Sequence, residues 1–149
     1  MKQYIGTKII KAEPAYRVDG KVFVKANIVP SGVHIEDGYK VVYPDGYESW
    51  SPKDVFEAAY RATDGMSFGL AIEAAKIGKK IARAGWNGKN QYVELAYCIS
   101  YKNNAGEIVN VGHDAIGNKA LAFVGTSGVQ MGWLASQADM LADDWKIVE

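Results

Sequence analysis

The stretch QYVELAYCISYKNNAGEIV, residues Gln91–Val109, decides the fold, because its apolar and polar side chains alternate with a period of two. That period is typical of a β-strand with one buried face. The turn motif NNAG, residues 103–106, then allows residues 107–111 to return as a partner strand. We therefore expect one long strand that runs up to the turn, with Cys98 buried in its middle, and a hairpin after it.

The sequence on either side of this strand predicts the rest of an α+β domain. Upstream, Ser67 is placed to cap a helix that Gly78 ends. The apolar residues at helical spacing are Leu70, Ala74, Ile77 and Ile81. Further short strands are expected downstream over Lys119–Val124, Val129–Leu134 and Trp145–Val148. A helix followed by an antiparallel sheet is an α+β arrangement.

A seam at RATDG, residues 61–65, separates this domain from a smaller module. We expect the small module over residues 1–62 and the larger domain over residues 66–149. GYKVVYPDGYESW, residues 38–50, predicts a β-hairpin around a Pro-Asp-Gly turn. Ser51 and Pro52 then predict the start of a helix, with Ser51 as its cap and Asp54 completing a capping box. The small module is therefore expected to be a β-hairpin and helix unit.

Composition limits the classes of function. The chain of 149 residues is long enough to bury a core. It has 17 Lys and Arg against 17 Asp and Glu, and this neutral balance disfavours binding to long DNA or RNA. A single Cys98 excludes an intrachain disulfide and a multi-cysteine zinc site, which fits a reducing compartment. Because neither a signal peptide nor a membrane-spanning stretch is seen, we expect a soluble, cytoplasmic protein.

Two short segments carry the inventory of a ligand site. ARAGWNG (residues 82–88) and WLASQADMLADDW (residues 133–145) bring together tryptophans, an arginine, amides, hydroxyls and carboxylates. Such groups suit a planar, polar ligand that bears phosphates. Neither segment contains an activated nucleophile. The pattern indicates binding rather than catalysis, so no catalytic residue is assigned.

Several of these residues have two interpretations. Trp86 lies in a turn between Gly85 and Asn87, where it either stacks on a ligand or packs. Arg83 precedes it by three residues and could aim its planar fork at a diphosphate. Asp139 either caps the turn ADMLADD, or accepts hydrogen bonds from ribose hydroxyls, or joins Asp143 and Asp144 in a metal cluster, the last being the weakest alternative. Trp50 and Trp145 are expected to pack in their respective modules.

Catalytic and metal-binding alternatives are poorly supported. Cys98, His113 and Asp114 are residue types of a thiol hydrolase, but a cysteine within a strand lacks the helix start that stabilises a thiolate. The two histidines, His34 and His113, fall in different modules without ligand spacing. Neither GxxxxGK[ST] nor GxGxxG occurs, so the usual phosphate cradles are missing. We therefore expect no metal and no cofactor.

Residues 66–149 resemble the phage anti-Thoeris proteins of the second type. The resemblance rests on MSFGLAIEAAKIGKKIARAGWNG (residues 66–88) and WLASQADMLADDWKIVE (residues 133–149). It implies a small non-enzymatic sponge, a homotetramer, that acts in the cytoplasm of the infected bacterium. Its partner would be a cyclic nucleotide signal, such as an ADP-ribose isomer cyclised through its sugars, with cyclic dinucleotides as a second class. The module over residues 1–62 resembles a small accessory module of phage proteins.

Carried over by position, the resemblance assigns a ligand site. Trp86 and Asn87 would contact the base or ribose. The pocket would be completed by Trp133, Ser136, Gln137 and Asp139. The sequence departs from the family at Gly132, where a proline is common, and residues 107–125 lack clear correspondence. Two rival classes remain open: an interaction module that uses its tryptophans as anchors, and a nucleotide-processing enzyme.

Overall fold

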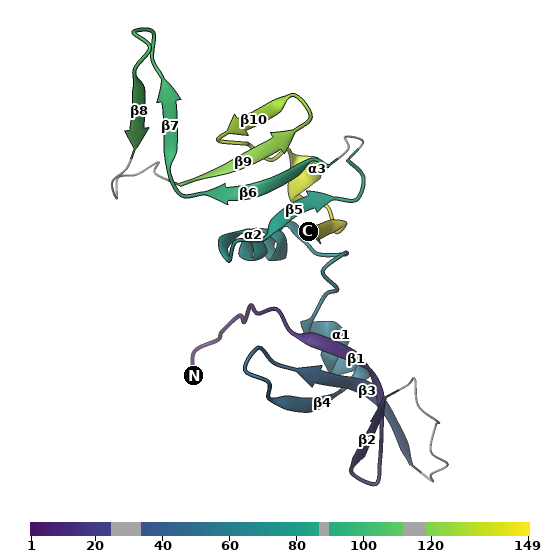
Figure 1. Ribbon diagram of the computed structural model, residues 1–149. Helices are drawn as coiled ribbons and strands as arrows, with labels where there is room; N and C mark the ends of the chain where they lie inside the picture. Colours follow the sequence, from purple (N-terminus) through teal and green to yellow (C-terminus); the bar gives the residue numbers. More distant parts are fainter. Residues whose placement is uncertain (25–33, 87–89, 112–118) are drawn as a thin grey trace. The chain divides into compact units, whose positions relative to one another are not determined.

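The computed structural model describes residues 1–24, 34–86, 90–111 and 119–149. Its backbone divides into two compact units, unit 1 over Met1–Arg61 and unit 2 over Ala62–Glu149, and each is described by itself. Both units are built mainly from antiparallel strands with a few short helices, which confirms the expected α+β class (Figure 1). Within the described ranges, no helix has the length and apolar character needed to cross a bilayer.

Unit 1 is an antiparallel sheet with one short helix. Its elements are β1 (Lys11–Val18), β2 (Lys21–Val24), β3 (Ile35–Val42), β4 (Glu48–Pro52) and α1 (Lys53–Ala59). The strand order β2-β1-β3-β4 places β1 and β3 in the middle. Between β3 and β4 the N–H of Tyr43 donates to the carbonyl of Tyr47 at 2.8 Å, and Gly46 takes a φ of +86° that favours glycine. The predicted hairpin is confirmed.

The helix of unit 1 begins without the predicted cap. Ser51 pairs with Tyr39 as part of β4, and its hydroxyl donates to the carbonyl of Pro52 at 3.5 Å. Among the described residues, no side chain caps the first turn of α1, so the predicted box of Ser51 and Asp54 is wrong. Strand β4 extends through Pro52, so Ser51 is part of the sheet and is not available to cap the helix. Packing holds α1 instead, because the rings of Phe56 and Tyr39 stack with centroids 4.1 Å apart.

Trp50 packs tightly within the sheet of unit 1. A β-carbon placed on Gly38 would clash with the backbone carbonyl oxygen of Ser51 and would lie 2.7 Å from the indole of Trp50, closer than two carbon atoms approach without strain. The guanidinium of Arg17 lies 4.1 Å from the centre of the same indole, within the range of a cation–π contact. A glycine is therefore required at position 38 for Trp50 to lie where it does.

Unit 2 contains a five-stranded sheet, a separate hairpin and two helices in its described part. Its elements are α2 (Phe68–Lys76), β5 (Lys80–Arg83), β6 (Tyr92–Ala96), β7 (Ile99–Lys102), β8 (Ile108–Val111), β9 (Ala120–Gly125), β10 (Gly128–Met131), α3 (Gln137–Met140) and β11 (Trp145–Val148). The sheet has the order β10-β9-β6-β5-β11, and β7 pairs with β8 (Figure 1). The strands expected over residues 119–124 and 145–148 are confirmed, whereas the strand expected over residues 129–134 forms as β10 but ends at Met131.

The helix α2 forms largely as predicted and packs on the sheet. The hydroxyl of Ser67 accepts from the N–H of Leu70 at 3.4 Å, and Gly78 adopts a φ of +89° just after the helix. Ile81 was expected in the apolar stripe of this helix, but it belongs to β5 and pairs with Val93 and Ile147. The turn at Gly78 separates it from the helix, and helical spacing alone does not reveal that separation.

Small side chains allow α2 to approach the sheet closely. Ala71, Ala74 and Ala75 are buried on the helix and cluster with Ile81, Val93 and Trp145 on the strands. The indole of Trp145 has no exposed surface. The core of unit 2 therefore lies between α2 and one face of the five-stranded sheet, with Trp145 at its centre, as expected for that residue.

The predicted long strand is interrupted at Tyr97 and Cys98. Before the break, β6 pairs with β5 and β9, and after it β7 pairs with β8. The Tyr97 hydroxyl donates to the carbonyl of Lys76 at 3.4 Å, which ties the end of β6 to the end of α2. The expectation of a buried Cys98 is wrong, because its side chain lies exposed at the break. The alternation of apolar and polar residues continues through the break, so the sequence pattern does not reveal where the strand ends.

Candidate functional site

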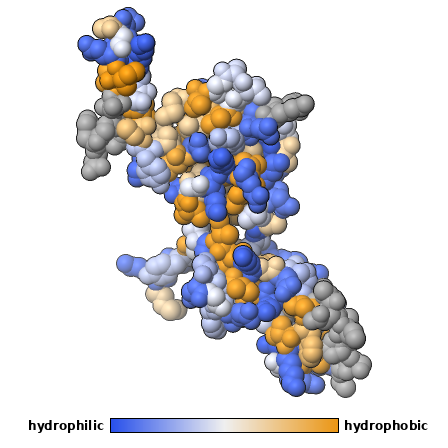
Figure 2. Space-filling view, in the orientation of Figure 1, coloured by the Kyte–Doolittle hydropathy of each residue, from blue (hydrophilic) through white to orange (hydrophobic). Residues whose placement is uncertain are grey.

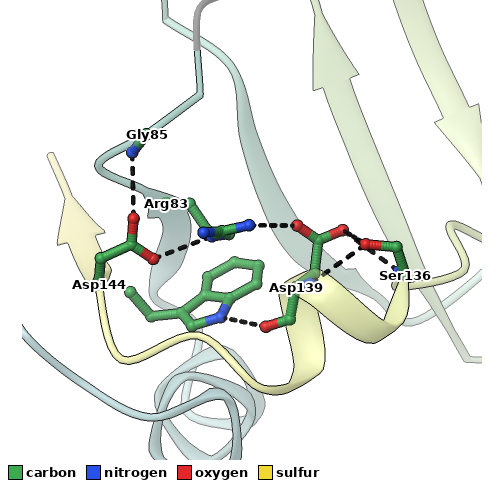
Figure 3. A network of polar contacts seen from close by, with 6 residues as sticks. Arg83, Gly85, Ser136, Asp139 and Asp144 are labelled. Carbon is green, nitrogen blue, oxygen red and sulfur yellow. Dashed lines mark hydrogen bonds and ion pairs between the residues drawn. The ribbon is translucent and has the colours of Figure 1, made fainter.

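Arg83, at the end of β5, links segments that are far apart in the sequence. Its Nε donates to Oδ1 of Asp144 at 2.9 Å, and its Nη1 donates to Oδ1 of Asp139 at 3.0 Å. The other oxygen of Asp144, Oδ2, accepts from the backbone N–H of Gly85 at 3.2 Å. We call these four residues the Arg83 clasp. Figure 3 shows the guanidinium lying between the two carboxylates.

Asp139 is also held by the first turn of α3. The Ser136 hydroxyl accepts from the N–H of Asp139 at 3.1 Å, and the Asp139 carboxylate accepts from the N–H of Ser136 at 3.2 Å. This is a capping box in which Ser136 is the cap and Asp139 is the third residue of the helix, so the assignment of Asp139 as the cap is corrected. The carbonyl of Asp139 accepts from the indole N–H of Trp145 at 2.8 Å. The start of α3 is thereby joined to the core.

These contacts shift the pKa of each charged group in the clasp. Burial alone would raise the pKa of Asp139, but hydrogen bonds from Arg83, Ser136 and Trp86 together lower it. The pKa of Asp144 is lowered, chiefly by its hydrogen bond from Arg83. The hydrogen bonds to Asp144 and then Asp139 raise the pKa of Arg83. At neutral pH the clasp therefore carries two negative charges and one positive charge.

Four aromatic rings pack together beside the clasp. The centroid of the Trp86 ring lies 5.4 Å from Phe123, 5.4 Å from Trp145 and 6.0 Å from Trp133, each with edge-to-face geometry. Trp86 and Trp133 are partly buried against the core. Of the two interpretations of Trp86, the packing of its ring is therefore seen in the structure. The backbone of Trp86 closes a turn, because its N–H donates to the carbonyl of Arg83 at 3.3 Å, and its ring packs against the core.

The structure connects most of the predicted site residues. Ring contacts and hydrogen bonds, with Trp145 as the link, join Arg83, Trp86, Trp133, Ser136 and Asp139 into one group. Gln137 is the first residue of α3, next to Ser136, and its side chain is exposed. Asn87 lies outside the described residues. The two segments chosen from the sequence therefore meet in space.

Sequence reasoning missed the role of Asp144. It was considered only within the acidic turn, and the Arg83 that it binds lies 61 residues earlier. The pairing of Arg83 with Trp145 in the β5–β11 register brings these residues together. One feature of the sequence could have indicated this contact: the segment around Arg83 is extended, so it could pair as a strand with residues 145–148. Phe123 was likewise missed, although it belongs to the expected strand over residues 119–124.

Other candidate groups lie elsewhere or outside the described residues. His34 has its Nε2 3.6 Å from Glu36 in unit 1, whereas His113 and Asp114 fall outside the described ranges. In the part of the chain that the structure describes, no cluster of three or more His, Cys, Asp or Glu suits a metal ion. A surface hollow of about 480 Å³ in unit 1 is lined by Val22, Phe23, Val24, Lys40, Glu48, Ser49 and Trp50, none of which is a predicted site residue.

Comparison with known proteins places unit 2 in a family. A family model described as the Thoeris anti-defense 2-like domain matches residues 66–148. The protein Thoeris anti-defense 2 of Bacillus phage SP01 is 39% identical over 88 residues, which cover 56% of this chain and 94% of that protein. The match includes both segments that form the Arg83 clasp and the aromatic group. The chain belongs to the Thoeris anti-defense 2-like family.

Proposed function

We propose that this protein counteracts the Thoeris defence of a bacterial host by binding a cyclic nucleotide signal and withholding it from the host effector. The signal is a cyclic ADP-ribose isomer, and cyclic dinucleotides are an alternative second class. The observation that carries the proposal is the 39% identity over 94% of the length of a phage protein named Thoeris anti-defense 2. Sequestration needs no chemical step, and we propose that it takes place in the cytoplasm of the infected host.

The connected group in unit 2 supports this proposal chemically. The indoles of Trp86 and Trp133 are partly exposed and offer surfaces for a base or ribose. Stacking of a base on an aromatic side chain contributes about 1–3 kcal/mol. Ser136 and Gln137 add a hydroxyl and an amide at the start of α3, and Asn87 follows Trp86 in the chain. These groups match a ligand that is flat at one end and polar at the other.

Affinity arithmetic favours an oligomer. A sponge needs a nanomolar dissociation constant, about −12 kcal/mol. Ligands of drug size gain about −0.3 kcal/mol per heavy atom, so a ligand of about 35 heavy atoms must be engaged over nearly its whole surface. The candidate surface in unit 2 lies at the outside of one small unit. We therefore propose a homo-oligomer, a tetramer, in which protomers meet around the ligand.

Titration calorimetry with a synthetic cyclic ADP-ribose isomer tests the proposal, with linear ADP-ribose as the control ligand. Wild-type protein is expected to bind the cyclic isomer and to discriminate against the linear form. Gln137→Ala is expected to weaken binding by the value of one buried polar hydrogen bond, about 1–3 kcal/mol. The matched control is Gln3→Ala, because Gln3 is also exposed but belongs to unit 1, outside the residues that form the connected group. Equal affinity of both variants would remove Gln137 from the site.

Exposed apolar side chains favour a second candidate, an interaction module that binds a host protein. Leu134 and Leu141, on either side of the first turn of α3, are 89% and 78% exposed. Figure 2 shows hydrophobic and hydrophilic side chains interspersed over the visible face of the chain. Exposed leucines of this kind also suit contacts between protomers. If Leu134→Asp leaves the wild-type assembly and ligand affinity unchanged but abolishes counter-defence in infected cells, the host-protein candidate is favoured.

A further inference from the structure

We infer that Arg83 and Asp144 are positioning residues of the ligand site, which hold the Trp86 segment against the start of α3 rather than contact the phosphates of the ligand. The inference rests on the proposed function and deepens it. It also replaces the sequence-based role of Arg83, which aimed its guanidinium at a diphosphate.

The clasp joins the two segments that carry the proposed ligand contacts. On one side, Asp144 binds both the Arg83 side chain and the N–H of Gly85, the residue directly before Trp86. On the other side, Arg83 binds Asp139, which forms the capping box with Ser136. A movement of either segment therefore breaks a charge-assisted hydrogen bond. Figure 3 shows this chain of contacts running from Gly85 through the guanidinium to Ser136.

The charge of the clasp argues against a direct phosphate contact. Two of the nitrogens of the guanidinium, Nε and Nη1, already donate to carboxylates. With Asp139 and Asp144 ionised, the three side chains sum to one negative charge, because one positive charge stands against two negative charges. A diphosphate that approached this group would meet net repulsion. The fork of Arg83 is engaged within the protein, where it fixes geometry.

The two carboxylate oxygens of Asp144 have separate tasks. Oδ1 accepts from the side chain of Arg83, and Oδ2 accepts from the backbone of Gly85. An asparagine at this position has nearly the same size but only one acceptor oxygen, and its amide group donates. Asp144→Asn therefore breaks one of the two contacts without leaving a cavity. Asp143→Asn is the matched control, because Asp143 is the adjacent, exposed carboxylate and lies outside the clasp.

A direct contact and a positioning role predict opposite effects of Asp144→Asn. If Arg83 contacts phosphate, removal of a competing carboxylate makes the site more positive, and binding becomes tighter or stays unchanged. If Arg83 positions Trp86, binding becomes weaker by about tenfold, although the local charge is more favourable to an anion. The sign of the change in affinity therefore decides between them, and loss of stability alone does not alter the affinity of protein that is fully folded.

The experiment is calorimetric titration of the full chain with a cyclic ADP-ribose isomer, at a temperature well below the melting point of each variant. Near-ultraviolet circular dichroism of the ligand-free proteins reports on the packed indoles of Trp86, Trp133 and Trp145. We expect Asp144→Asn to weaken binding about tenfold and to alter the near-ultraviolet spectrum, while Asp143→Asn matches wild type in both. Equal or tighter binding by Asp144→Asn overturns the positioning role and leaves the proposed function standing.

A second variant keeps the test decisive if Asp144→Asn does not fold. Arg83→Lys retains the positive charge but replaces the planar fork with a single ammonium, which cannot hold both carboxylates in the same geometry. Positioning predicts about tenfold weaker binding together with an altered near-ultraviolet spectrum of the ligand-free variant, whereas a direct phosphate contact predicts weaker binding with an unchanged spectrum. Affinity close to wild type, or weaker binding with an unchanged spectrum, overturns positioning. If wild-type protein and Asp143→Asn both fail to bind any cyclic isomer, the proposed function is overturned and the positioning role with it.

Discussion

Trp86→Ala is expected to destabilise unit 2 even when no ligand is present. The Trp86 ring makes edge-to-face contacts with Phe123, Trp133 and Trp145 at centroid distances of 5.4 to 6.0 Å. Each aromatic pair contributes about 0.5–1.5 kcal/mol beyond the area that it buries. Replacement of a fully buried tryptophan by alanine costs about 3–5 kcal/mol. Because Trp86 is only partly buried, we expect a loss of about 2–3 kcal/mol in the free energy of unfolding.

Thermal and urea unfolding of the ligand-free protein measures this loss. For a unit of 88 residues, Ala62–Glu149, about 2–3 kcal/mol corresponds to a fall in melting temperature of roughly 10–20 °C. Ile108→Ala is the control, since its side chain is 65% exposed on the separate hairpin of β7 and β8 and its truncation is expected to change stability by about 0.5 kcal/mol or less. A melting temperature of Trp86→Ala equal to that of Ile108→Ala would refute the packed position of the ring. The affinity of Trp86→Ala must then be measured on the folded fraction.

Three further predictions concern the units, the clasp and the assembly. Gly38→Ala is expected to destabilise unit 1 by about 1–3 kcal/mol, because the added methyl group clashes with the Ser51 carbonyl and the Trp50 indole. The melting of unit 2 and its ligand affinity should stay unchanged, and lost affinity would contradict independent units. Asp139 and Asp144 have lowered pKa values, so they contribute stability that is present above the unfolded-state pKa of about 3.9 and is lost as the pH falls through the lower folded-state values. Asp144→Asn should therefore melt below wild type at neutral pH and converge with it in acid, and a difference that is constant with pH would contradict an ionised Asp144. Light scattering at micromolar concentration is expected to give the mass of a tetramer, and a monomer would remove the shared site.

The sequence predicted elements whose signals are local. Ser67 and Gly78 mark the start and end of α2 because a cap and a left-handed residue act on their immediate neighbours. The turn at residues 44–46 has a similar local cause. The sequence did not predict the break at Tyr97 and Cys98, because an alternating pattern is the same whether a strand continues or bends away to a new partner.

The site was predicted only in part, because its residue types are visible in the sequence whereas the partners of its strands are not. Trp86 and Ser136 were chosen as residue types, and the structure brings their segments together. The inward packing of Trp86 and the contact of Arg83 with Asp144 both depend on the pairing of β5 with β11. These two strands lie more than 60 residues apart in the sequence, and tertiary packing decides that they pair. No short sequence motif indicates such a pairing. The partner of Arg83 was therefore the part of the site that only the structure supplied.

Mass spectrometry of material released by heat tests sequestration most directly. The purified full chain is incubated with a cyclic ADP-ribose isomer, freed of unbound ligand, and heated until it unfolds, and the released small molecules are analysed. We expect the intact cyclic nucleotide, in an amount stoichiometric with the binding sites. Release of a product heavier by one water would contradict sequestration and indicate hydrolysis, and release of no nucleotide would contradict binding itself.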